Sequence, residues 1–304
     1  MNLPAFDFQP VIVIGAARSG TNMLRDLLTR HSQVSTWPCD EINYLWRVGN
    51  ASFPTDELES EQASPRTVAT IRKQFARLAR QHKAQWVIEK TCANSLRVDY
   101  VNAIVPEAKF LFLVRDGVDV VASATQRWRA PLKLPYVLKK AAYIPFQDVP
   151  YYATRYLRHR AQRLFDAQQC LPTWGPRFAG IEAALRSCSL EEVCALQWQR
   201  CVEHSDRALS CLPSERVLYV RYEAFVQRPT DEFARVLDFL GIEVDEAFLY
   251  NAVRHITAHS VGKGWQQLAR PVCAKIEPQV AATLQQLTEK CQEATACVQV
   301  RQAA

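Results

Sequence analysis

The feature that most constrains the fold of this chain is a buried-strand pattern that runs directly into a glycine-bounded turn. Pro10–Gly15 holds four β-branched residues in succession, which is typical of a strand covered on both faces. Thr21–His31 then places its apolar residues on one face, which indicates a helix. The turn between them gathers backbone N–H groups and a helix N-terminus around one point, so the pattern predicts an anion-binding loop.

Strand and helix patterns alternate along the rest of the chain. Further buried strands are expected at Trp86–Ile88, Lys109–Val114 and Arg216–Tyr222. Helices are expected from Pro65 behind a Ser64 N-cap, before Pro106, at about 117–129, at about 190–212, at Thr230–Leu240 with Thr230 as N-cap, and at about 278–291. The alternation predicts an α/β fold with a mostly parallel, P-loop-like central sheet flanked by helices. We expect one domain over residues 1–304, with a helical insertion at about 128–212 that includes Tyr151–Gln169.

Composition excludes several classes of protein. Apolar residues make up 48% of the 304 residues and charged residues 22%, as in globular proteins. A formal net charge of +6 suits phosphate or sulfate ligands but is far below that of ribosomal or histone-like chains, so we expect no nucleic-acid partner. The ten cysteines form no C-x-x-C pair and none lies beside a histidine at metal-ligand spacing, which favours reduced core residues and no bound metal.

The start of the chain and its apolar runs bear on localisation. Met1–Pro10 lacks the basic and apolar regions of a secretory signal peptide. No apolar run reaches the roughly 20 residues that a membrane-spanning helix requires. We therefore expect a cytoplasmic, bacterial type of protein without a transmembrane segment, while peripheral contact with a membrane surface stays open.

The loop after the first strand carries its own cation. The spacing from Gly15 to Gly20 is that of a nucleoside-triphosphate P-loop, but Thr21 stands where such enzymes have the lysine that bridges the terminal phosphates. An ordinary strand-to-helix turn is the alternative. Arg-Ser-Gly-Thr after an apolar strand resembles the 5′-phosphosulfate loop of sulfotransferases that use 3′-phosphoadenosine 5′-phosphosulfate (PAPS). The resemblance implies a P-loop-like fold and nucleotide binding, without a metal, by Arg18, Ser19, Gly20, Thr21 and Asn22.

A second strand-to-helix junction supports the same resemblance. Arg115 follows the strand Lys109–Val114, at the sheet edge where open α/β sheets bind ligands, and Ser123 comes eight residues later. This pattern resembles the 3′-phosphate motif of sulfotransferases, in which the Arg and the Ser bind the 3′-phosphate of PAPS. Arg127 matches a further nucleotide-binding Arg of the tyrosylprotein sulfotransferases. The alternatives are a solvated Arg115–Asp116 pair, or Asp116 as a magnesium ligand.

Three later segments extend the resemblance. Arg-Tyr-Glu at Tyr222 is similar to a family segment whose Tyr contacts the nucleotide, although a strand-end Tyr that completes the core is an equal alternative. His259–Trp265 looks like the C-terminal loop that folds over the nucleotide in many sulfotransferases, and Gly264 departs from that pattern. The resemblance assigns nucleotide contacts there to Ser260, Gly262 and Lys263. Trp174–Gly180 also resembles a stretch of bacterial sulfotransferases.

Sulfuryl transfer requires a base for the acceptor hydroxyl and a cation for the departing oxygen. Glu41, which follows Asp40, resembles the second member of the acidic pair that holds the base of tyrosylprotein sulfotransferases. Glu89 and Lys90 begin a Glu-Lys-Thr segment similar to the heparan N-sulfotransferase domain, where the Glu is catalytic. The resemblance makes Lys90 the residue that stabilises the transition state. Glu41 is the favoured base and Glu89 the rival; a solvated loop acid and a partner for Lys90 or Arg18 are the simpler interpretations.

The sequence predicts a PAPS-dependent sulfotransferase, and two other functions remain as alternatives. One is an ATP-dependent small-molecule kinase on the same fold, and the other is a non-catalytic nucleotide-binding protein. The acceptor stays open among a glycan, a lipid, a tyrosine peptide and another small molecule. The aromatic and basic stretch Trp128–Arg163 is expected either to form one side of the acceptor cleft or to be a plain helical subdomain.

Overall fold

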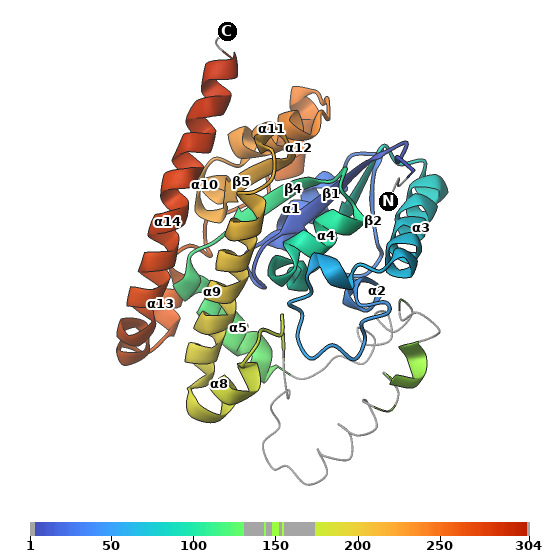
Figure 1. Ribbon diagram of the computed structural model, residues 1–304. Coiled ribbons are helices and arrows are strands. Elements are labelled where there is room, and N and C mark those ends of the chain that lie inside the picture. Colours follow the sequence, from blue (N-terminus) through green and yellow to red (C-terminus); the bar gives the residue numbers. More distant parts are fainter. Residues whose placement is uncertain (1–3, 131–142, 144–147, 152–153, 155–173, 303–304) are drawn as a thin grey trace.

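The structure, a computed structural model, describes residues 4–130, 143, 148–151, 154 and 174–302 (Figure 1). Its strands are β1 (Gln9–Ile14), β2 (Val34–Thr36), β3 (Trp86–Glu89), β4 (Lys109–Val114) and β5 (Val217–Arg221). They form one sheet in the order β2-β3-β1-β4-β5, and every neighbouring pair is parallel. The chain first moves to one side of β1 and then to the other, so the sheet has its switch point beside β1. Ligands of open α/β sheets bind at the carboxyl ends of the strands near such a point.

The helices alternate with these strands. They are α1 (Thr21–Leu28), α2 (Asn43–Trp46), α3 (Pro65–His82), α4 (Val98–Ile104), α5 (Gly117–Arg129), α8 (Ile181–Ser187), α9 (Leu190–Leu209), α10 (Tyr222–Gln227), α11 (Pro229–Leu240), α12 (Glu246–Val253), α13 (Lys263–Gln267) and α14 (Arg270–Gln302). Short 3-10 turns occupy Ser60–Gln62, Cys92–Leu96 and Ser214–Arg216. No helix among the described residues is both long enough and apolar enough to cross a membrane.

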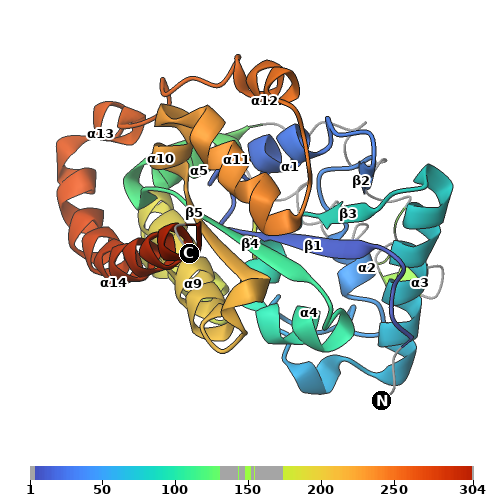
Figure 2. The same cartoon turned by 90° about the horizontal axis from the view of Figure 1, so that it is seen from above.

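Successive side chains of the central strands enter two different hydrophobic clusters. In β1, Ile12 and Ile14 pack into the cluster that holds residues of α3, α4, α5, α9 and α14, whereas Val11 and Val13 pack with residues of α1, α10, α11 and α12. Figure 2 shows these two groups of helices on opposite sides of the sheet. Both faces are therefore buried, which is why the strand sequences read as continuous apolar runs.

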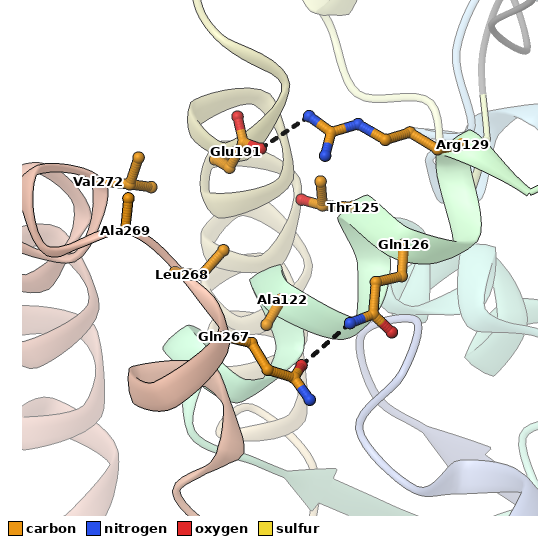
Figure 3. Close-up of a pocket in the computed structure, with 9 residues that line it drawn as sticks. All are labelled: Ala122, Thr125, Gln126, Arg129, Glu191, Gln267, Leu268, Ala269 and Val272. Atoms are coloured by element: carbon orange, nitrogen blue, oxygen red, sulfur yellow. Dashed lines mark hydrogen bonds and ion pairs between the residues drawn. The ribbon is translucent and has the colours of Figure 1, made fainter.

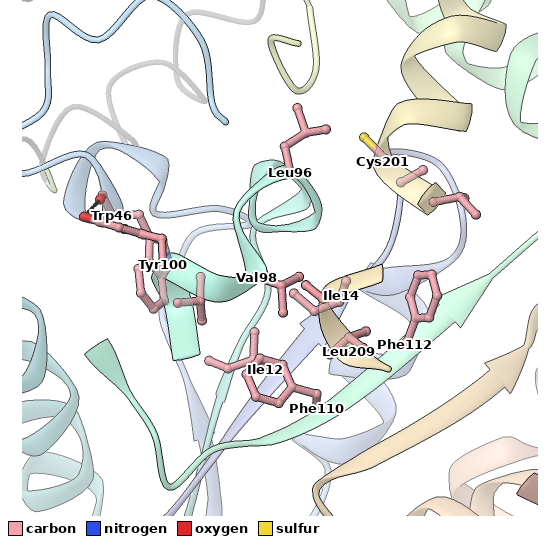
Figure 4. Packing of buried hydrophobic residues seen from close by; sticks show 14 of the residues in the cluster. Ile12, Ile14, Trp46, Leu96, Val98, Tyr100, Phe110, Phe112, Cys201 and Leu209 are labelled. Atoms are coloured by element: carbon pink, nitrogen blue, oxygen red, sulfur yellow. Dashed lines mark hydrogen bonds between the residues drawn. The ribbon is translucent and has the colours of Figure 1, made fainter. Parts of the chain in front are cut away.

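The first cluster anchors the segments that lead to the polar end of the sheet. Figure 4 shows the side chain of Trp46, from α2, beside that of Tyr100, from α4. The Tyr100 hydroxyl donates to the main-chain oxygen of Trp46 at 2.7 Å. Trp46 and Tyr100 are both fully buried. The short helix α2, which follows Glu41, is thereby fixed against the core.

The predicted α/β fold with a parallel central sheet is confirmed, and so are the strands at the two predicted binding segments. The Ser64 hydroxyl accepts the N–H of Thr67, as expected for the N-cap of α3. Gly241 ends α11 in a left-handed conformation. Free thiols are found at Cys39, Cys92, Cys188, Cys194, Cys201, Cys211 and Cys273. The helix expected at Tyr151–Gln169 lies mostly outside the described residues.

Two predicted helix starts are wrong. Helix α11 begins at Pro229 behind Arg228, and Thr230 is not its N-cap; Pro229 fits the first helical position because it has no N–H to satisfy. Helix α14 begins at Arg270, and Pro278 lies inside it. The side chains of Cys273 and Ile276 on the earlier turns are buried in the core, and this tertiary packing outweighs the hydrogen bond that proline removes.

Candidate active site

The loop between β1 and α1 is closely packed on both sides. A Cβ on Gly15 would lie 2.7 Å from the main-chain oxygen of Leu113 in β4, and one on Gly20 would lie 2.6 Å from the ring of Tyr222. Arg18 and Gly20 adopt positive φ angles of 75° and 94°, so the chain turns sharply, as in the turns whose backbone N–H groups form anion-binding concavities. Both glycines are therefore required by close approach.

Two buried polar atoms at this loop have no partner among the described residues. They are the hydroxyl of Ser19 and the Nε of Arg115. A buried donor that is left unsatisfied costs free energy. An anion held in the loop would satisfy such donors, so these atoms make the loop a candidate anion site.

Arg115 brings together residues that are far apart in the sequence. Its guanidinium donates to the main-chain oxygen of Arg18 at 3.2 Å and to that of Ser260 at 2.8 Å. It also lies 4.4 Å from the centre of the Tyr222 ring. The loop, β4 and the segment before α13 therefore meet at one arginine.

The predicted nucleotide-binding residues of α5 lie at the same place. Arg18 Nε donates to the Ser123 hydroxyl at 2.9 Å. Burial lowers the pKa of the Arg18 guanidinium, and the charges of Arg127 and Arg115 lower it further. Three like charges at one position repel each other, and they are stabilised when an anion binds between them. The two predicted phosphate motifs thus form one cationic site.

The segment before α13, which holds Ser260 and Gly262, lies against this site through Arg115 and Asp119. The Ser260 hydroxyl is 2.6 Å from the Tyr222 hydroxyl. Tyr222 is the first residue of α10 rather than the last of β5, and it is buried against Gly20. Lys263 begins α13 with an exposed side chain, and Asn22 is exposed on the first turn of α1.

Glu41 and Lys90 pair beside the loop. Lys90 Nζ donates to Glu41 Oε1 at 3.4 Å, and the N–H of Cys92 donates to the same oxygen at 3.4 Å. Burial opposes the charge on Lys90, but the nearby carboxylates of Glu41 and Asp40, together with Cys92, outweigh it and raise the Lys90 pKa. Lys90 therefore stays an ammonium group.

This pair is connected to the phosphate loop through Cys92. The Thr21 hydroxyl lies 3.8 Å from the Cys92 sulfur, so Thr21 and Glu41 both contact Cys92. The side chain of Glu41 is 24% exposed and that of Lys90 3% exposed. Glu41 can therefore be reached from solvent, whereas Lys90 is held inside.

Glu89 belongs to a different environment. It is buried, and it accepts hydrogen bonds from the Thr91 hydroxyl at 2.5 Å and from the Asn94 amide at 2.8 Å. Burial raises its pKa to about 7. Asn94 in turn accepts from Arg97 Nε at 2.8 Å. Glu89 thus stands at the end of β3 in a closed network, next to Lys90 in sequence.

Sequence analysis missed two parts of this arrangement. Asp119 accepts the N–H groups of Gly262 at 2.9 Å and of Gly264 at 2.6 Å, but acids in the first turn of a helix are common and gave no signal. Asp56, which lies 3.6 Å from Arg97 of the Glu89 network, is a loop acid without a motif. Gly264, which departs from the family pattern, was the one signal in the sequence. A Cβ at this position would clash with the main-chain oxygen of Val118 in α5.

Asp116 has a structural partner. Its carboxylate accepts the N–H of Asp119 at 3.0 Å and caps α5. This use does not favour the magnesium-ligand alternative. Within the described part of the chain, no group of three His, Cys, Asp or Glu residues gathers in a way that could hold a metal ion.

Comparisons with known proteins agree with the geometry. A family model described as the sulfotransferase family matches residues 10–172 and 175–246, more than half of the chain. A search of curated protein sequences found no match.

Solved structures share the fold. The sulfotransferase domain from the curacin biosynthetic pathway is 15% identical, covers 93% of this chain and 99% of its own, and has a TM-score of 0.55. The sulfotransferase domain from the Synechococcus PCC 7002 olefin synthase is 16% identical, with coverages of 92% and 96% and a TM-score of 0.53. Mouse sulfotransferase SULT7A1 complexed with PAP is 12% identical, with coverages of 95% and 89% and a TM-score of 0.51.

Proposed function

The chain belongs to the sulfotransferase family, and from this premise we propose that it transfers the sulfuryl group of PAPS to a hydroxyl of an acceptor molecule. One observation carries the proposal. Arg18, Arg115 and Arg127 converge where two buried donors, on Ser19 and Arg115, have no partner among the described residues. A nucleotide with phosphate at both ends would supply the missing negative charge and acceptors.

The site divides into two anion positions. The loop residues Arg18, Ser19, Gly20, Thr21 and Asn22 bind the 5′-phosphosulfate. The 3′-phosphate is bound by Arg115, Ser123 and Arg127. The hydrogen bond from Arg18 to Ser123 joins the two positions. Tyr222, Ser260, Gly262 and Lys263 cover the nucleotide, which is supported by the contact between the Tyr222 and Ser260 hydroxyls.

The reaction we propose is an in-line displacement at sulfur. Glu41 takes the proton of the acceptor hydroxyl as its oxygen forms a bond to sulfur. The bond from sulfur to the 5′-phosphate oxygen breaks, and that oxygen keeps the electron pair. Lys90 and the loop donors stabilise the charge that develops on it. The products are the sulfated acceptor and PAP, the desulfonated nucleotide.

Glu41 is a better base than Glu89 for two reasons. Its carboxylate is 24% exposed, so an acceptor can reach it, whereas Glu89 is 1% exposed. Both Glu89 oxygens also receive hydrogen bonds from neighbouring side chains. We therefore propose that Glu89 positions Lys90 and Thr91, and that Glu41 carries the proton.

The acceptor is a small molecule, a glycan or a lipid in this proposal, and the location is the cytoplasm. The expected acceptor wall, Trp128–Arg163, lies mostly outside the described residues. Its sequence of aromatic rings between cations suits an acidic or glycan-like acceptor. Charge reversal of Lys139 and Lys140 should raise the KM for the acceptor and leave PAP affinity unchanged. Normal acceptor kinetics, or equal loss of both ligands, would refute this assignment.

Calorimetry can test the nucleotide assignment before an acceptor is known. In the presence of EDTA, PAP should bind in the micromolar range or more tightly, and ATP should bind more weakly. Arg18→Ala should weaken PAP, whereas Arg177→Ala, which removes the Arg177–Glu182 pair, should not. Magnesium-dependent binding of ATP that is tighter than that of PAP would favour a kinase instead.

A further inference from the structure

One buried carboxylate touches both the arginine of the 3′-phosphate position and the segment that covers it. Asp119 is 3% exposed. Its Oδ2 accepts the N–H of Gly262 at 2.9 Å and lies 3.7 Å from Arg115 NH2. Its Oδ1 accepts the N–H of Gly264 at 2.6 Å.

The helix that follows is seated along α5 by further contacts. A Cβ on Gly264 would lie only 2.4 Å from the main-chain oxygen of Val118, so the two backbones nearly touch. At the other end of α13, Gln126 Nε2 donates to Gln267 Oε1 at 3.1 Å. Figure 3 shows this bond beside the small cavity between α5, α9 and the start of α14. Helix α13 is thus tied to α5 at both ends.

The negative charge of Asp119 bears on its role at this site. A carboxylate beside Arg115 weakens the attraction of this site for an anion, and its burial costs free energy unless hydrogen bonds compensate. Both costs are offset by the two N–H groups and the arginine that it holds. Asp119 therefore contributes by positioning Arg115 and the two glycine N–H groups, since its charge alone would oppose the binding of an anion.

We propose that Asp119 is a positioning residue that couples the seating of segment 260–264 to the orientation of Arg115, and thereby selects nucleotides that carry a 3′-phosphate. The same arginine donates to the main-chain oxygen of Ser260 in that segment, so a shift of the segment also changes the orientation of Arg115. The inference rests on the proposed function, because it takes PAP as the ligand.

The test is Asp119→Asn, measured by calorimetry with PAP and with adenosine 5′-phosphosulfate, which lacks the 3′-phosphate. The amide keeps the size of the side chain but can accept only one of the two N–H groups. PAP affinity should fall about tenfold or more, and adenosine 5′-phosphosulfate affinity by less than about threefold. By electrostatics alone, removing the negative charge beside Arg115 would strengthen PAP binding. A loss of PAP affinity would therefore report the positioning role.

Asp116→Asn is the matched control. It removes a carboxylate from the same turn but keeps an N-cap, since Asn caps as well as Asp. PAP affinity should stay unchanged or rise. In addition, Arg115→Ala combined with Asp119→Asn should bind PAP no more weakly than Arg115→Ala alone, because contacts that act as one unit are not additive.

Several outcomes would overturn the inference. They are unchanged or tighter PAP binding by Asp119→Asn, equal loss of both nucleotides, or additive losses in the double variant. Should Asp119→Asn fail to fold, Gln267→Ala loosens α13 at an exposed contact and should reduce PAP affinity selectively, by about two- to fivefold; no reduction would count against the coupling. If the unaltered protein fails to bind PAP, the proposed function fails instead.

Discussion

At the scale of single residues, the candidate site depends on Arg115, a buried cation with one N–H left unpaired among the described residues. Arg115 binds two main-chain oxygens and stacks on Tyr222, yet its buried Nε has no partner among the described residues. A guanidinium held this way presents its remaining N–H in a fixed direction. This geometry suits recognition of one phosphate at one place.

Arg115→Ala should weaken PAP by roughly 1.5–3 kcal/mol for each charge-assisted hydrogen bond lost. Adenosine 5′-phosphosulfate should bind almost as before, since it has no 3′-phosphate. Calorimetry with both nucleotides measures the difference. Equal losses would mean that Arg115 supports the loop structurally and does not contact the phosphate.

Glu89 predicts a pH dependence of stability. Its folded-state pKa is raised from 4.5 to about 7, so the folded protein binds more protons than the unfolded chain between these values. Its contribution to the free energy of unfolding is therefore greatest at low pH and declines as pH rises through about 7. The decline is of the order of 3 kcal/mol at most.

Glu89→Gln should remove this decline, as measured by urea unfolding between about pH 5 and pH 8. Glu107→Gln is the matched contrast. Glu107 pairs with Arg72 at 2.6 Å, and although partial burial opposes it, this pairing lowers the Glu107 pKa. The Glu107–Arg72 pair stabilises the folded state above the ordinary pKa of a glutamate. Glu107→Gln should therefore lower the free energy of unfolding at neutral pH. Parallel pH profiles of Glu89→Gln and the unaltered protein would contradict the assignment.

The elements that carry the candidate site could be predicted from local sequence, because strand, turn and helix follow one another without interruption. Arg18, Arg115 and Ser123 each lie within such a unit, and the parallel sheet brings the units to one edge. The resemblance favoured Glu41 over Glu89 as base, but the difference in burial between the two could not be predicted, because burial depends on residues distant in sequence. Asn94 and Arg97 close off Glu89, and neither belongs to a motif.

At the scale of elements, α5 organises the site. In its first turn, Asp119 accepts hydrogen bonds from the N–H groups of Gly262 and Gly264. One turn later, the Ser123 hydroxyl accepts a hydrogen bond from Arg18. Short elements such as β2 (Val34–Thr36) and α13 were missed from sequence, since a few residues carry too little periodicity to identify a strand or helix. Tertiary contacts decide where they form.

Gly264→Ala tests the seating of α13. The new methyl group would meet the main-chain oxygen of Val118 at 2.4 Å, so the segment must move away from α5. PAP affinity and the melting temperature should both fall. Gly241→Ala is the control, because it has a left-handed φ of 73° but nothing within 4 Å of the added Cβ. It should cost about 1 kcal/mol of stability and leave PAP affinity unchanged. Equal PAP affinity in both variants would contradict the role of the seating.

At the scale of the whole molecule, the candidate site joins segments that are far apart in the sequence. The loop after β1, the junction after β4 and the segment before α13 all contribute to one site. A ligand that binds only the folded state stabilises it by mass action, by about 2.7 kcal/mol at a concentration of 100 times its Kd. PAP should therefore raise the melting temperature in EDTA, and adenosine should not. An unchanged melting temperature at saturating PAP would contradict the assignment of the site.

The most direct test of the central claim follows the sulfur atom. Protein, PAPS labelled at sulfur and a panel of phenols, sugars and hydroxylated lipids are incubated in EDTA, and label in the acceptors is measured together with PAP. We predict label in at least one acceptor with an equal amount of PAP, and a rate about 10²–10⁴-fold lower for Glu41→Gln, the loss expected when a general base is removed. Label in the acceptor at an unchanged rate in Glu41→Gln would contradict the role of Glu41. PAP that forms without labelled acceptor, or no reaction of PAPS while ATP phosphorylates the same panel in magnesium, would contradict sulfuryl transfer itself.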